Sequence, residues 1–94
     1  MEKKLKILIV DGDVSEAEIL ESRLQTDFEV AGTAFDGVRA VEKIKGQLPD
    51  VVLIDIMLPQ IDGIGVIEKC REEMEYEQLP VFIVLTSIGT EKLI

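Results

Sequence analysis

The sequence contains no histidine, and this absence removes several kinds of site at once. Histidine-ligated metal centres, histidine general bases and serine–histidine triads are all excluded. Any chemistry must therefore use carboxylates, hydroxyls, lysine, arginine or a bound cation. Cysteine is almost absent as well, since Cys70 stands alone and cannot form an internal disulfide. That usage is typical of a reducing compartment, and Cys70 is interpreted as a small apolar residue on a helix.

Long apolar runs are also missing. No stretch approaches the roughly 18 apolar residues that a membrane-spanning helix needs. The amino terminus carries charges, but no signal-peptide core follows them, because Asp11 interrupts the apolar run within a few residues. We therefore expect a cytoplasmic protein that has no membrane partner.

Basic residues are scarce: 10 lysines and arginines stand against 19 aspartates and glutamates, for a net charge of −9. Phosphate contacts need lysine and arginine, so nucleic acid is disfavoured as a direct partner of this segment. The chain of 94 residues is 47% apolar and 31% charged. This length and composition predict a single globular domain over residues 1–94.

What is present is a regular alternation of short apolar runs with helical patterns. Strands are expected over residues 5–10, 28–34, 51–55 and 81–85, and helices over residues 14–25, 38–47 and 64–74. The polar run 72–78 is expected to form a charged loop, and residues 91–94 look like the first turn of a further helix. Such alternation is typical of βαβ units and predicts an α/β fold with a doubly wound parallel sheet.

Polar side chains end three of the expected strands: Asp11 and Asp13, then Asp55, then Thr86 and Ser87. They converge if these strands are neighbours, because parallel strands end at one edge of the sheet. Clustered carboxylates repel one another, and Mg²⁺ relieves that repulsion. A carboxylate beside such a cation can attack a phosphoryl group. Acids at strand ends are also common as helix caps, so the pattern leaves two roles open: a cation site and helix capping.

Three segments carry a clear resemblance to a known family. Residues 7–13 (Ile-Leu-Ile-Val-Asp-Gly-Asp), 55–63 (Asp-Ile-Met-Leu-Pro-Gln-Ile-Asp-Gly) and 84–87 (Val-Leu-Thr-Ser) resemble the receiver domain of two-component response regulators. The match runs in register over the whole chain, and the Asp-x-x-x-Pro-x-x-Asp-Gly stretch joined to the other two motifs is a specific signal. Residues 1–3, 65–69 and 84–89 are most similar to receivers of regulators that control sporulation and transcription.

The resemblance implies a flavodoxin-like sheet with strand order 2-1-3-4-5. It implies that Asp55 accepts a phosphoryl group from a histidine kinase or a phosphotransfer protein, so that the domain signals and is not a turnover enzyme. Asp11 and its neighbours, including Asp13, would hold Mg²⁺ together with Asp55 and the backbone carbonyl of Met57. Thr86 would be the switch hydroxyl.

Position 12 departs from the family pattern. The family usually has two adjacent acids after the first strand, and the second usually binds the metal; here that position is Gly12. Asp13, one residue further on, could reach the metal because glycine lets the turn relax. The alternative is that Asp13 only caps the first helix, for which it has capping-box spacing with Glu16. Weaker Mg²⁺ binding is expected from this departure.

The chain also stops at Ile94, whereas the family continues through a fourth helix, a fifth strand, a lysine and a fifth helix. Residues 1–94 are therefore expected to be a truncated receiver whose output domain is absent. The expected strand 81–85 is apolar on both faces and would become an exposed edge, which predicts self-association through that strand and the carboxyl-terminal segment. Gly12 and the missing lysine leave an alternative function open: a non-phosphorylated pseudo-receiver that acts as a dimerisation or protein-interaction module.

Overall fold

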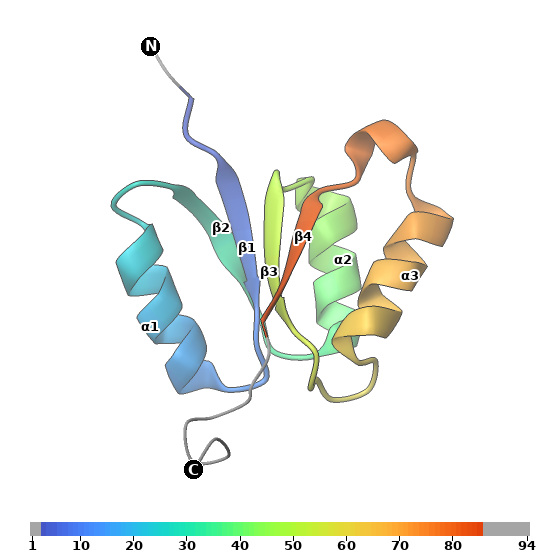
Figure 1. Cartoon of the computed structure of the whole chain (residues 1–94), viewed down its shortest axis with the longest axis horizontal. Coiled ribbons are helices and arrows are strands. Elements are labelled where there is room, and N and C mark those ends of the chain that lie inside the picture. Colours follow the sequence, from blue (N-terminus) through green and yellow to red (C-terminus); the bar gives the residue numbers. More distant parts are fainter. Residues whose placement is uncertain (1–2, 86–94) are drawn as a thin grey trace.

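The computed structural model describes residues 3–85. Strands and helices alternate along this part of the chain, as the sequence predicted (Figure 1). In chain order the elements are β1 (Lys6–Val10), α1 (Val14–Leu24), β2 (Glu29–Ala34), α2 (Gly37–Gln47), β3 (Val51–Asp55), α3 (Gly63–Glu73), the 3-10 helix η1 (Tyr76–Gln78) and β4 (Val81–Leu85). Thr86 and the helix start expected at residues 91–94 lie outside the described residues.

The four described strands form one parallel sheet in the order β2-β1-β3-β4. Register aligns Ile9 of β1 with Leu53 of β3, and Leu53 with Ile83 of β4. The predicted α/β class is thereby confirmed, as is the part of the implied strand order that falls within these residues. β1 and β3 are the central strands, which places the ends of both in the middle of one sheet edge.

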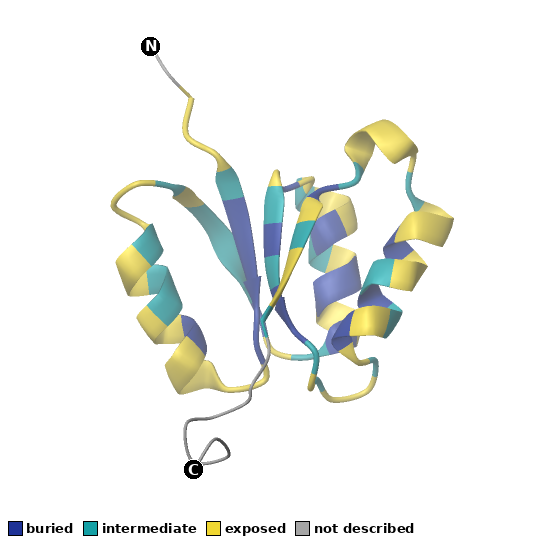
Figure 2. Ribbon diagram, in the orientation of Figure 1, coloured by how far each residue is buried: buried dark blue, intermediate teal, exposed yellow. Residues whose placement is uncertain are grey.

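Helices cover both faces of the sheet. α2 and α3 pack side by side on one face, where Leu8, Val52 and Ile54 meet Ile44 and Val66 in the larger core (Figures 1 and 2). α1 covers the other face over β1 and β2, where Ile7 and Ile9 meet Ala17. Strand side chains alternate between the faces, so neighbouring residues of β1 enter different cores.

An aspartate starts each of the three α-helices. Asp13 accepts hydrogen bonds from the backbone N–H groups at the start of α1, Asp36 does the same for α2, and Asp62 for α3. These side chains satisfy donors that have no partner within the helix. The predicted helix starts are therefore right to within a residue.

One local expectation was wrong, and one helix face is less covered than its spacing alone shows. The segment predicted as a charged loop contains the 3-10 helix η1, a single turn that is closed by backbone hydrogen bonds. A single turn is too short to produce a periodic pattern of apolar side chains in the sequence. In α1 only Ala17 is fully buried, and Val14 keeps 49% of its surface exposed. Helical spacing shows which residues share a face, but it does not show how much of that face is covered.

Within residues 3–85, β4 lies at one edge of the sheet. It pairs with β3 alone, and Val81, Ile83 and Val84 remain 63%, 46% and 38% exposed. In Figure 2 much of the β4 ribbon is yellow, the colour of exposed residues, whereas the central strands beside it are largely dark blue, the colour of buried residues. Among the helices of residues 3–85, none is long and apolar enough to cross a membrane.

Candidate functional site

Two carboxylates lie side by side at the edge where the central strands end. Val10 of β1 pairs with Ile54 of β3, so Asp11 and Asp55, the next residue of each segment, are neighbours. They are only 5% and 8% exposed, and they are the buried charged residues of the described part of the chain. Side chains of this kind are rarely buried without a partner or a function. The predicted convergence of Asp11 and Asp55 is thus present.

Backbone hydrogen bonds fix both carboxylates. Asp11 Oδ1 accepts from the backbone N–H of Asp13 at 2.9 Å, and Asp55 Oδ1 accepts from the backbone N–H of Met57 at 3.1 Å. The backbone N–H of Asp11 donates to the carbonyl oxygen of Ala34 at 3.0 Å, which extends the β1–β2 pairing by one residue. Each acid is therefore held at its strand end by the turn that follows it.

Burial and mutual repulsion govern the charge of this site. Burial raises the pKa of Asp11 above its ordinary value, the charges on Asp55 and Asp13 raise it further, and the hydrogen bond from Asp13 N–H opposes them. Glu16, on the first turn of α1, has its pKa raised chiefly by the charges on Asp11 and Asp13. Negative charge thus accumulates here, and a cation would relieve it.

Glu16 is a member of this acidic group that was not predicted as part of the site. Its expected role was in a capping box, one turn into an amphipathic helix. The signal that could have revealed it is its position three residues after Asp13, which keeps it within one helical turn of that acid. It is exposed, so it adds to the field of the site from the solvent side.

Asp13 serves the helix. Its Oδ1 accepts from the backbone N–H groups of Ser15 at 2.8 Å and Glu16 at 3.2 Å. This capping role is the alternative that the sequence left open. Both bonds go to the same oxygen, so Oδ2 can still face a cation.

The loop after β3 needs glycine at one point. A Cβ on Gly63 would lie 2.5 Å from the carbonyl oxygen of Asp55, which is too close for any other residue without a backbone shift. The Gly63 N–H also donates to the Ile56 carbonyl oxygen at 2.9 Å. Asp62-Gly63, the end of the 55–63 motif, is therefore the point where α3 begins directly against the end of β3.

Gly12 faces the same loop but is not required by packing. A Cβ at this position would lie 3.5 Å from the Met57 carbonyl oxygen and 3.5 Å from Pro59 Cδ, both ordinary contacts. A side chain would fit here, directed at the carbonyl that the family resemblance assigns to the metal. The structure thus brings the Met57 carbonyl to the turn that carries Asp11.

The donor set consists of oxygen atoms: two buried carboxylates and a backbone carbonyl. Hard divalent cations such as Mg²⁺ bind such donors and complete their coordination with water. Within residues 3–85, no group of three or more His, Cys, Asp or Glu side chains is arranged to hold a metal. The available donors therefore fit a hydrated Mg²⁺ and do not form a closed protein cage.

Comparison with known proteins identifies the family. The profile of the response regulator receiver domain matches residues 7–94. The probable transcriptional regulator ycf27 of Guillardia theta is 40% identical over 89 residues, covering 95% of this chain and 34% of the regulator. The chain thus spans about a third of the length of that relative. The receiver profile covers nearly all of this chain.

Solved structures agree. The CheX–CheY–BeF3–Mg complex from Borrelia burgdorferi matches with 30% identity and a TM-score of 0.79, covering 95% of this chain and 66% of that one. The response regulator domain of Thermotoga maritima CheB matches with 29% identity and a TM-score of 0.77, covering 95% of this chain and 65% of that one.

Proposed function

Because this chain belongs to the response regulator receiver family, we propose that Asp55 is its phosphoacceptor. The observation that carries the proposal is the buried Asp55 carboxylate at the end of β3, beside Asp11. The donor would be a phosphohistidine of a histidine kinase or a phosphotransfer protein. A carboxylate oxygen of Asp55 attacks phosphorus, the P–N bond breaks, and the imidazole leaves with the bonding electron pair and takes up a proton.

The surroundings of Asp55 suit it to this step. Its Oδ1 accepts from the Met57 N–H, which fixes the plane of the carboxylate, and its burial limits attack by water on the acyl phosphate. Asp11, Asp55 and the Met57 carbonyl would hold Mg²⁺, with Asp13 adding an oxygen. The cation would supply charge neutralisation between the carboxylates and the phosphoryl oxygens. Such a domain signals through its phosphorylated state and is not a turnover enzyme.

Thr86 is proposed as the hydroxyl that donates to the phosphoryl oxygens. Leu85 pairs with Asp55 across β3 and β4, and Thr86 is the next residue in the chain. This register supports the assignment.

The proposal is tested by intact mass spectrometry after incubation with acetyl phosphate and Mg²⁺. We expect a mass increase of one phosphoryl group that is lost in Asp55→Asn and reduced when Mg²⁺ is chelated. Asp11→Asn should keep its fold and react more slowly, because its amide preserves the hydrogen bond from Asp13 but weakens cation binding. An unmodified wild-type mass would refute phosphoacceptor function for this chain.

A second function is favoured by a different observation. Gly12 supplies no side-chain oxygen, Asp13 caps α1, and β4 presents an apolar edge. These features support a non-phosphorylated pseudo-receiver that acts as a dimerisation or protein-interaction module. It predicts that Mg²⁺ at millimolar concentration leaves the amide NMR spectrum unchanged and that Asp55→Asn associates like the wild type. Shifts confined to the strand-end residues would contradict it.

The wider setting is proposed on the same footing. Residues 1–94 would be a cytoplasmic receiver segment of a regulator whose output is transcription, as the name of the ycf27 relative suggests. The proposal that this regulator controls sporulation rests on the similarity of residues 1–3, 65–69 and 84–89 to receivers of sporulation regulators. Phosphoryl transfer from a sporulation phosphotransfer protein should then outpace transfer from a chemotaxis kinase, and equal rates would refute the sporulation assignment.

A further inference from the structure

β2 lies at the other edge of the sheet formed within residues 3–85, and a side chain already occupies one carbonyl of that edge. The carbonyl oxygen of Ala34 accepts from the backbone N–H of Asp11, so it faces β1. Successive residues of a strand direct their backbone groups to opposite sides, so the Thr33 carbonyl faces away from β1. Lys43 Nζ donates to that Thr33 oxygen at 2.6 Å. A strand of a second copy would need the same oxygen as an acceptor.

A β-bulge interrupts the same edge. The pairing of β2 with β1 shifts by one residue between Val30 and Gly32, so Ala31 is an extra residue of β2. Gly32 has a φ of +153°, a backbone conformation that other residues rarely adopt, although a Cβ there would meet only Lys43 Nζ, at 4.0 Å. The backbone of the bulge therefore favours glycine here. The bulge breaks the regular spacing of outward N–H and C=O groups that a further strand would have to match.

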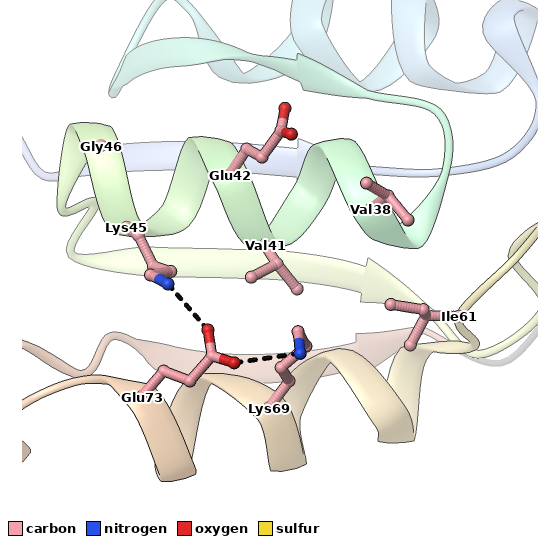
Figure 3. Close-up of a pocket in the computed structure, with 8 residues that line it drawn as sticks. All are labelled: Val38, Val41, Glu42, Lys45, Gly46, Ile61, Lys69 and Glu73. Atoms are coloured by element: carbon pink, nitrogen blue, oxygen red, sulfur yellow. Dashed lines mark hydrogen bonds and ion pairs between the residues drawn. The ribbon is translucent and has the colours of Figure 1, made fainter.

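The two lysines of α2 have different partners. Lys45 lies on the side of α2 that borders α3, beside a groove of about 530 Å³, and bonds Glu73 at 2.7 Å (Figure 3). Lys43 pairs with none of the carboxylates in the described part of the chain. Its partly buried ammonium group donates to a backbone oxygen instead, and such a charge-assisted bond is stronger than one between neutral groups. Lys43 therefore acts on the β2 edge, whereas Lys45 links two helices.

The two edges of the described sheet differ in this respect. β4 pairs with β3 residue for residue over Val81–Leu85, without a register shift, and it contains no charged residue. β2 has both a bulge and a lysine on an outward carbonyl, and natural proteins use each of these features to keep edge strands from pairing. If copies could join through both edges, sheets would extend from copy to copy without end, whereas a single available edge closes the assembly at two copies.

We propose that Lys43 and the bulge at Gly32 close the β2 edge to other copies of this chain, so that copies cannot join into an open-ended sheet. Pairing would require the ammonium group to give up the Thr33 oxygen. The incoming strand would also meet unevenly spaced donors and acceptors beside Ala31. The proposal goes beyond the phosphoacceptor function and does not depend on it.

Lys43→Met tests the proposal, because methionine removes the ammonium group but keeps an unbranched side chain that favours helix. In sedimentation velocity of the full 94-residue chain, we expect this variant to form species larger than the wild type that grow with concentration. Hydrogen exchange locates the contact: the Thr33 amide lies on the same side as its carbonyl and should exchange about tenfold or more slowly than in the wild type. Lys43→Arg retains a charged donor and should sediment like the wild type.

The matched control is Lys45→Met, which removes the same charge from the same helix but leaves the Thr33 carbonyl covered. It should sediment like the wild type. A Lys43→Met chain of wild-type size would overturn the proposal, and equal growth of both methionine variants would do so by making the effect one of net charge. Larger Lys43→Met species that lose amide protection throughout β1 would also refute it, because Lys43 would then only stabilise the fold.

Discussion

At residue scale, Gly12 lies where a side chain would meet the Met57 carbonyl at ordinary contact distance. Gly12→Asp should therefore add a carboxylate to the oxygen donors of Asp11 and Asp55. We expect Mg²⁺ affinity to rise by about tenfold or more, because each added carboxylate strengthens a hard-cation site. Titration with Mg²⁺ followed by calorimetry measures the change.

The control for that substitution is Gly46→Asp, which adds the same charge in open space on α2. It should leave Mg²⁺ affinity near the wild-type value. If both variants gained affinity equally, the effect would be one of net charge, and the assignment of position 12 to the site would be wrong.

Cys70 gives a prediction in alkaline solution. Its side chain is fully buried, and burial raises its pKa from 9.0 to about 11, with the charge on Glu73 adding to the effect. The folded state then keeps the thiol proton where the unfolded chain loses it, so stability falls as pH rises from about 9 to about 11. The loss attributable to Cys70 should be roughly 1–2 kcal/mol.

Chemical denaturation at several pH values measures this loss. The comparison is with Cys70→Ala, which should be less stable near neutral pH yet lose less stability between pH 9 and 11. Parallel curves for the two proteins would show that the thiol does not contribute.

At element scale, the glycines of α2 differ sharply in what surrounds them. Gly37→Ala would force a Cβ into the Ile61 carbonyl, and we expect a loss of about 1–3 kcal/mol in the free energy of unfolding. Gly46→Ala meets nothing and should gain about 0.5 kcal/mol through helix propensity. Urea denaturation of the two variants measures both changes in the free energy of unfolding. Equal changes would mean that Ile61 does not pack closely against Gly37.

The strands and helix starts could be predicted because their signals are local. Aspartates such as Asp13, Asp36 and Asp62 indicate helix starts because their carboxylates accept hydrogen bonds from the first backbone N–H groups of a helix. Short apolar runs such as residues 51–55 indicate buried strands. The exposure of Val14 could not be predicted, because it depends on how far α1 extends over the sheet. η1 was missed because one turn of 3-10 helix leaves no side-chain period.

The candidate site divides in the same way. Asp11 and Asp55 could be predicted because parallel strands bring their ends to one edge. The electrostatic effect of Glu16 on the site and the groove between α2 and α3 both depend on distances between separate elements. The spacing of residues within one helix gives no information about those distances. Thr86 stays a prediction, because it lies outside the described residues.

At the scale of the whole molecule, self-association is predicted through β4, which lies at an edge of the sheet formed within residues 3–85. The strand Val81–Leu85 has no charged residue, so two copies could pair through it without placing like charges opposite each other. We propose an isologous dimer through this edge, present at micromolar concentration in sedimentation experiments.

Ile83→Lys should shift this equilibrium to monomer, because lysine on an edge strand opposes pairing. Ile19→Lys on α1 is the matched control: Ile19 is 54% exposed against 46% for Ile83, and its replacement should leave the dimer intact. A wild-type chain that sediments as a monomer throughout the range would contradict the proposal.

The central claim is that Asp55 receives the phosphoryl group, and its location can be read directly. Borohydride reduces an aspartyl phosphate to homoserine, which tandem mass spectrometry places in the sequence. After phosphorylation with acetyl phosphate and Mg²⁺, we predict homoserine at position 55 and unmodified aspartate at positions 11 and 13. Homoserine at another position, or none in the wild-type chain, would contradict the account.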